Sequence, residues 1–146
     1  MEHRFAIKFA HWSLRVGRTD SVTGLRPEFH GLIVTAVDDL SQSIGNLILT
    51  PLGSVPTQPL KGCDLYPFID RVAGEAIPNL TQAIWDALEI WEPRIVVQDV
   101  TVEEVAFGHF ATRVFWRPSE SVLDDLRITE VHFASANDDS ARARVA

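Results

Sequence analysis

The sequence predicts an α+β fold, in which short helices and one main amphipathic helix pack on a small antiparallel β-meander. Two observations support this: helical apolar periodicity over residues 78–91, and strand-like stretches at residues 94–102, 106–116 and 126–134. Helices that precede a run of strands are typical of α+β domains, whereas regular alternation would indicate an α/β fold. The chain has 146 residues, and we expect one domain, residues 1–146, with its own core.

Composition is that of an ordinary globular protein, with 46% hydrophobic and 23% charged residues. The formal net charge of −7 argues against a nucleic-acid binder, which is usually basic. The single cysteine, Cys63, rules out an internal disulfide and suits a reducing compartment. No apolar run approaches the roughly 20 residues that span a bilayer, so no membrane role is expected.

The first elements are the least regular. Residues 5–14 are mixed, but alternation over residues 4–9 allows a short strand, and residues 15–28 are expected to form a loop rich in polar residues. Residues 31–37 are a second strand candidate. We expect residues 1–35 as a whole to form an N-terminal extension of the domain.

A short helix is expected next. Asp38 and Asp39 could cap it, because their side-chain oxygens can accept free N–H groups of the first turn. Gly45 should weaken the helix by about 1 kcal/mol relative to alanine. Its buried side would hold apolar residues at helical spacing, namely Leu40, Ile44, Leu47 and Ile48.

Residues 50–62 are predicted to form an extended, stiff loop that packs on the surface. Gly53 and Gly62 permit positive φ and are assigned to turns, since they are too far apart for a phosphate-binding loop. Prolines in this loop remove backbone donors: Pro51, Pro56 and Pro59. A short helix over residues 65–72 and a link over residues 73–76 would follow.

The main helix is expected to begin at Pro78, where a missing N–H has no helical partner anyway, and to run to Trp91. Its apolar face would hold Leu80, Ala83, Ile84, Ala87, Leu88 and Trp91. Pro93 should end the helix, because its ring pushes Glu92 out of the α region. The β-branched residues that follow, from Ile95 on, favour a strand.

The strands after this joint are expected to form a meander. The link at residues 104–107 is short enough for a tight antiparallel hairpin. In the second strand one side would hold Phe110, Thr112, Val114 and Trp116, and the opposite side His109, Ala111, Arg113 and Phe115. Residues 135–146 are small and polar, and we expect a flexible tail there.

The joint Glu92-Pro93-Arg94 is the candidate docking site. Side chains two apart in extended backbone project to the same side, so we expect both charges to lie exposed on one surface. As a plain surface ion pair they would contribute about 0–1 kcal/mol. The alternative is a recognition surface, on which Arg94 captures a partner carboxylate or carbonyl with two parallel hydrogen bonds.

Other chemistry finds little support in the sequence. The histidines form no closely spaced metal motif, and we expect neither a metal nor a cofactor. A glycosidase would need a paired acid with a raised pKa, and nothing marks Glu89, Glu92 or Asp99 as that acid. Ser54 is not in a Gly-x-Ser-x-Gly turn. No catalytic residue is assigned.

The order of these motifs resembles the baseplate assembly protein W family, the wedge family of contractile-tail phages that includes TssE of type VI secretion. The resemblance covers about residues 36–104. It consists of the turn Leu47-Ile48-Leu49-Thr50, a loop with Gly53, Pro59 and Gly62, and a helix ending in Trp91-Glu92-Pro93-Arg94. The chain has Gly53-Ser54-Val55 where many members carry Gly-Glu-Arg or Gly-Lys-Arg.

The resemblance implies a structural role without enzymatic activity, although some members are labelled lysozyme-like. Several copies of the chain would lie in the sixfold tail baseplate of the virion, which would be assembled in the host cytoplasm. Its partners would be baseplate wedge proteins and the tail sheath protein, with the tail tube or hub as further candidates. The sheet would accept strands donated by sheath subunits, and the Glu92-Pro93-Arg94 joint would dock on the wedge core. The alternatives are a type VI secretion baseplate component and a peptidoglycan hydrolase.

Overall fold

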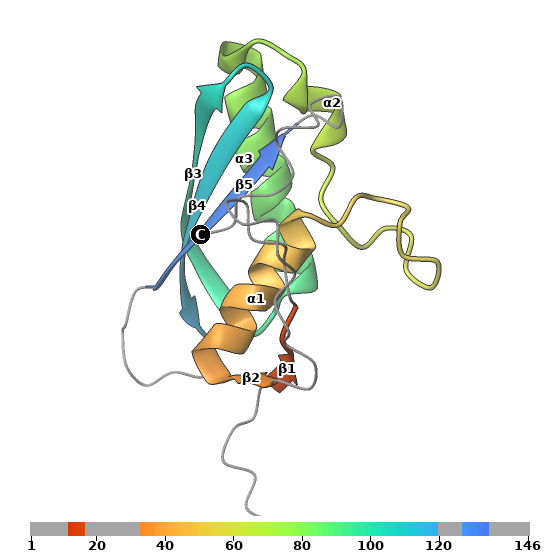
Figure 1. Cartoon of the computed structure of the whole chain (residues 1–146), viewed down its shortest axis with the longest axis vertical. Coiled ribbons are helices and arrows are strands. Elements are labelled where there is room, and N and C mark those ends of the chain that lie inside the picture. The colour runs from red at the N-terminus through yellow and green to blue at the C-terminus, as the bar shows by residue number, and fades with distance from the viewer. Residues whose placement is uncertain (1–11, 17–32, 120–126, 135–146) are drawn as a thin grey trace, which may run out of the picture.

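The structure, a computed structural model, describes residues 12–16, 33–119 and 127–134 and confirms the α+β prediction. An antiparallel sheet of order β3-β4-β5 carries helices on one face (Figure 1). Its strands are β3 (Ile95–Ala106), β4 (His109–Pro118) and β5 (Arg127–Ala134). The tail expected at residues 135–146 lies outside the described residues.

A small ribbon precedes the helices. Strand β1 (Trp12–Leu14) pairs antiparallel with β2 (Ile33–Thr35), which leads directly into helix α1 (Ala36–Ile48). Strand β2 falls inside the stretch predicted at residues 31–37. The alternation at residues 4–9 that allowed an earlier strand lies outside the described residues, as do all of residues 1–11 and 17–32, and β1 follows it in the chain.

Helix α1 buries its predicted apolar face, but its cap was predicted wrongly. The N-cap residue is Thr35, and Asp38 and Asp39 lie within the first turn. Carboxylates there still favour the helix, because they face the positive end of its dipole. Asp39 is 3% exposed, so it must have a partner inside the fold.

Residues 50–62 form an arm that projects from the side of the helices (Figure 1). Its neck is closed where the Cys63 N–H donates to the Thr50 carbonyl at 2.9 Å. Gly62 has a φ of 135°, and an added Cβ would come within 2.3 Å of the Thr50 oxygen. Gly53, with a φ of 79°, donates its N–H to Pro59 at 2.7 Å. Only glycine fits at position 62 without opening the neck.

Two helices follow the arm, α2 (Tyr66–Ile69) and α3 (Ala73–Trp91). Helix α2 is shorter than the predicted helix over residues 65–72. The predicted start of the main helix at Pro78 is wrong, because the expected link at residues 73–76 forms its first turn. Pro78 deprives the Gly74 carbonyl of a donor, but both residues are exposed, so water can replace that bond.

The core lies between the sheet and helices α1 and α3. Strand β4 presents the side predicted from its alternation, and all its members are buried: Phe110, Thr112, Val114 and Trp116. In β3 the inward positions change from odd (Ile95, Val97) to even (Val100, Val102). A bulge at Gln98 makes this possible, since Val97 pairs with Trp116 and Asp99 with the adjacent Phe115.

The outer face of the sheet is charged. Arg113 on β4 pairs with Glu103 on β3 at 3.0 Å and with Glu130 on β5 at 3.8 Å. The two edge strands differ in regularity: β3 has register shifts at Gln98 and Val105, whereas β5 pairs with β4 without a shift.

Candidate functional site

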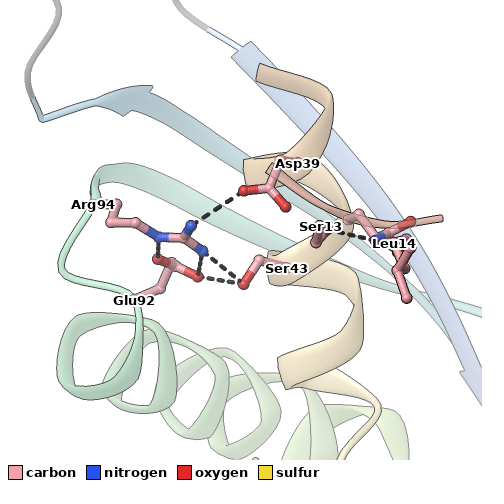
Figure 2. Close-up of polar contacts among 7 residues, drawn as sticks. Ser13, Leu14, Asp39, Ser43, Glu92 and Arg94 are labelled. Carbon is pink, nitrogen blue, oxygen red and sulfur yellow. Dashed lines mark hydrogen bonds and ion pairs between the residues drawn. The ribbon is translucent and has the colours of Figure 1, made fainter. Parts of the chain in front are cut away.

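The predicted joint forms a sharp corner between α3 and β3. The helix ends at Trp91, and the C-cap residue Glu92 leaves it with φ −125° and ψ 68°. Pro93 is exposed at the corner, and β3 begins at Ile95. The helix therefore stops where the sequence predicted, because a residue before proline is disfavoured in the α region. The corner turns the side chain of Arg94 toward α1 (Figure 2).

Four side chains meet there in what we call the ion cluster: Asp39, Ser43, Glu92 and Arg94. The Arg94 guanidinium donates to both Glu92 oxygens, from Nε to Oε1 at 2.5 Å and from Nη2 to Oε2 at 2.8 Å. Its Nη1 donates to Asp39 Oδ2 at 3.2 Å, and Nη2 donates also to Ser43 Oγ at 3.1 Å. The Ser43 hydroxyl donates to Glu92 Oε2, which closes the network (Figure 2).

The expectation that both charges of the joint are exposed is wrong. Glu92 is 4% exposed, and the Arg94 side chain is 34% exposed. The reason is α1, whose Asp39 and Ser43 lie one helical turn apart and both point at the corner. Sequence reasoning assigned Asp39 only to the helix cap and did not single out Ser43, although polar side chains four apart beside the apolar stripe of α1 were the available signal.

The cluster keeps its charges. Burial alone would raise the pKa of Glu92, but hydrogen bonds from Arg94 and Ser43 and the Arg94 charge outweigh it and lower that pKa below the usual value. The hydrogen bond to Glu92 raises the pKa of Arg94, and the charges of Glu92 and Asp39 add to this against the effect of burial. Two carboxylates around one guanidinium leave the cluster formally at −1.

This geometry limits what Arg94 can offer a partner. Its two-pronged face is occupied by Glu92, so bidentate capture of an outside carboxylate is not available in this arrangement. Of its five N–H groups, four are used in bonds to the described residues, which leaves one on Nη1. Arg94 therefore acts first as the internal link between α3, β3 and α1.

A hollow of about 700 Å³ opens beside the ion cluster, and we call it the corner hollow. The corner forms one wall, α1 the floor, and the arm and β1 the other walls, with Lys61 and Trp12 among the lining residues. The amide of Gln42 fixes β1 to α1 by donating to Ser13 Oγ at 3.0 Å and to the Leu14 carbonyl at 2.8 Å. Most of the lining residues are polar or charged, and Trp12 and Trp91 add aromatic surface.

Other candidate chemistry is not assembled in the described residues. No group of three or more potential metal-binding side chains occurs among them. None of their helices is both long and apolar enough to cross a bilayer. Ser54 donates its hydroxyl to the Pro51 carbonyl at 2.7 Å, so it serves the turn of the arm.

Comparison with known proteins bears directly on this region. The family described as "Baseplate wedge protein gp25" matches residues 34–111, more than half of the chain. Baseplate protein W of Escherichia phage P2 is 36% identical over 72 residues, which are 49% of this chain and 63% of that protein. The chain thus spans less than two thirds of the length of this relative.

Solved structures extend the comparison to the fold. A protein of Geobacter sulfurreducens described as a tail lysozyme is similar with a TM-score of 0.58 and 21% identity, over 73% of this chain and 99% of that one. A chain of the type VI secretion baseplate complex has a TM-score of 0.45 and 20% identity, over 67% of this chain and 89% of its own. At that level the second likeness adds nothing to the fold assignment.

Proposed function

Because this chain belongs to the baseplate wedge protein gp25 family, we propose that it is a structural component of a phage contractile-tail baseplate, where it joins the wedge to the first sheath ring. The observation that carries this is the extent of the family match. Residues 34–111 include α1, the arm, α3 and β3, and hence all four members of the ion cluster. The proposed location is the virion baseplate, after assembly in the host cytoplasm.

The corner hollow is the proposed docking surface for the wedge. Pro93 is exposed on its wall, and Arg94 and Lys61 contribute positive charge to a recess that also contains two carboxylates. Because the ion cluster ties the corner to α1, a partner would meet a surface that is already ordered, which reduces the entropy cost of binding. The same fixed corner would set the angle at which the chain sits in the wedge.

The edge of β5 is the proposed acceptor for a sheath strand. Strand addition needs a regular edge with free backbone groups, and β5 pairs with β4 without register shifts. Strand β3 is bulged at Gln98 and Val105, and bulges discourage pairing with an added strand. Ile128 of β5 is 59% exposed and would gain burial against an added strand.

Two alternatives remain open to direct test. Similarity to baseplate protein W of phage P2 favours a phage tail over a type VI secretion machine. Neighbouring genes for tail tube, sheath and tape measure would support the phage assignment, and secretion ATPase genes would overturn it. A peptidoglycan hydrolase needs an acid with a raised pKa, but that of Glu92 is lowered. Turnover of purified cell walls, abolished by one carboxylate-to-amide change, would favour the hydrolase.

The docking role is tested best at Pro93. Replacing Arg94 would leave Asp39 and Glu92 buried without their cation, at a cost of about 3 kcal/mol, so a defect there would be ambiguous. Pro93→Glu adds a charge on the exposed corner and should prevent attachment to the wedge. Pro56→Glu is the matched control, since Pro56 is exposed on the arm outside the corner hollow.

The measurement is complementation of a gene deletion in the contractile-tail system that encodes the chain, with tails counted by electron microscopy. The deletion should give tails without complete baseplates, and the wild-type and Pro56→Glu proteins should restore them. Pro93→Glu should fail to restore them while folding normally by circular dichroism. Normal tails with Pro93→Glu would overturn the corner as docking site, and complete baseplates in the deletion would overturn the structural role.

A further inference from the structure

A second hollow, which we call the α3 groove, lies on another side of the arm. It has a volume of about 350 Å³ and is bounded by Leu52, Leu60 and Gly62 of the arm region and by one side of α3. Trp91 lines both hollows, at the C-terminal end of α3. The roles proposed above do not use this groove.

The groove gathers large apolar side chains that water still reaches. Leu60 is 76% exposed, Ile90 66% and Leu52 44%. Single exposed apolar residues are common on protein surfaces, but three around one groove form a surface suited to a partner. Covering them would supply the apolar burial that drives association.

The shape of the groove matches a helix. The lining residues of α3 fall in two rows spaced by four, Asn79, Ala83, Ala87 and Trp91 in one and Gln82, Asp86 and Ile90 in the other. A ridge of side chains on an incoming helix packs between two such rows. Alanines in the middle of one row let a second backbone come close. From first to last lining residue the rows extend about 18 Å, which corresponds to about three helical turns.

The charge of the groove defines its partner. Asp64 and Asp86 are exposed among the lining residues, and no lysine or arginine lines the groove in the described part of the chain. Both carboxylates act on the Cys63 thiol. Burial is the largest cause of the raised pKa of that thiol, and the charges of Asp64 and Asp86 are the next. A second copy of this chain, with its net charge of −7, would bring more negative charge to this surface.

We propose that the α3 groove binds a basic amphipathic helix of another protein. Its apolar side chains, three and four positions apart, enter between the two rows of α3 and against Leu60. Its lysine or arginine side chains pair with Asp64 and Asp86. This site is independent of the wedge docking proposed for the corner hollow, because the lining residues differ except for Trp91.

The test uses the full chain and three synthetic peptides of about four helical turns. One carries leucines at helical spacing with lysines on the flanks, one has glutamates in place of the lysines, and one has the basic sequence scrambled. Fluorescence anisotropy of labelled peptide gives the affinity. The basic helix should bind at least tenfold tighter than either of the others.

Variants then locate the site. Leu60→Asn and Asp86→Asn should each weaken binding of the basic peptide at least fivefold. Val72→Asn and Glu104→Gln are the matched controls, because they alter an exposed apolar residue and an exposed carboxylate away from the groove, and they should bind the peptide as wild type does. The second control separates local recognition from attraction to the overall negative charge.

Several results would overturn the proposal. The first is an affinity for the acidic peptide equal to that for the basic peptide. The second is a loss of affinity in the control variants as large as in the groove variants. The third is no binding of the basic helix at millimolar concentration. Sedimentation that shows a dimer of the free chain, lost in Leu60→Asn, would assign the groove to a second copy instead. Pro93→Glu should bind the peptide normally, so failure of the corner assignment is distinguishable from failure here.

Discussion

Glu92 shows how one buried carboxylate can organise a corner. It receives hydrogen bonds from a guanidinium two residues away and from a serine on another helix. Because Glu92 is 4% exposed, its carboxylate depends on these bonds to offset the cost of desolvation. Loss of Arg94 would leave Glu92 and Asp39 buried without a cation.

This dependence predicts an acid-sensitive contribution to stability. The folded pKa of Glu92 lies below its unfolded value, so the stabilisation is complete above the unfolded pKa of about 4.3 and is lost as the pH falls through the folded pKa. Glu92→Gln should lower the free energy of unfolding by about 2 kcal/mol at neutral pH. The difference in the free energy of unfolding between Glu92→Gln and wild type should shrink as the pH falls below about 4.

Urea unfolding measured from neutral to acid pH checks this prediction. Glu104→Gln is the control for removal of one carboxylate, since Glu104 is exposed and lies outside the ion cluster. A Glu92→Gln difference that stays constant with pH would show that the effect comes from shape rather than from charge.

At the scale of elements, the bulge in β3 follows from a change of parity in the sequence. The apolar residues that face the core are at odd positions up to Val97 and at even positions from Val100, so one extra residue must be accommodated between the two sets. Gln98 is that residue. Without it, the remaining sequence alternates regularly between inward and outward side chains.

Deletion of Gln98 should therefore preserve the fold, with a change of about 1 kcal/mol or less in the free energy of unfolding. Deletion of Thr101 is the matched comparison, because it would move Val102 to the outer face and Glu103 toward the core. That variant should lose at least about 2 kcal/mol, from lost apolar burial and a buried charge. The midpoints of urea unfolding measure the stability of both deletion variants. Equal losses of stability would contradict the parity argument.

The edges of the sheet allow a second comparison. Ile128→Lys places a charge on the regular edge strand β5, where it should block an added strand and leave tails without sheath. Val105→Lys changes a similarly exposed apolar residue on the bulged strand β3 and should have no effect on sheath assembly. Electron microscopy of complemented tails distinguishes the two variants. Tails without sheath in Val105→Lys, and normal tails in Ile128→Lys, would assign the sheath strand to β3.

Elements with strong local signals were predictable from the sequence. The alternation of β4 and the stop at Pro93 depend on side-chain pattern and on proline sterics, and both are found in the structure. The start of α3 was not predictable from Pro78, because exposure of Gly74 lets water replace the missing bond. The ion cluster joins residues up to 55 positions apart, and no local pattern shows which helix will face a corner.

On the scale of the whole molecule, the arm separates two surfaces of different character. Leu60 lines the apolar and acidic α3 groove, whereas its neighbour Lys61 lines the polar corner hollow. Both surfaces depend on the neck of the arm, where Gly62 allows the two ends to meet. The role proposed above, in which the chain joins several neighbours, would need separate contact surfaces of this kind held in a fixed relation.

Cys63 lies at that neck and reports on the coupling between arm and core. It is 2% exposed, and burial, followed by the charges of Asp64 and Asp86, raises the pKa of its thiol to about 12. Because only the thiolate reacts, roughly one molecule in ten thousand would be reactive at a pH four units below that pKa. The thiol should react with a disulfide reagent only when the protein unfolds globally, so labelling rates should follow urea unfolding measured by circular dichroism.

The control for reagent access is Ser54→Cys in a Cys63→Ala background, because Ser54 is exposed on the same arm and its thiol should label at once. Rapid labelling of Cys63 without urea, at a rate that denaturant does not change, would mean that the neck opens locally while the core stays folded. The arm would then move independently of the helices, and the corner hollow and the α3 groove would not be fixed before a partner binds. Slow labelling that parallels global unfolding would mean that the arm stays fixed to the helices. Both hollows would then already be shaped in the free chain.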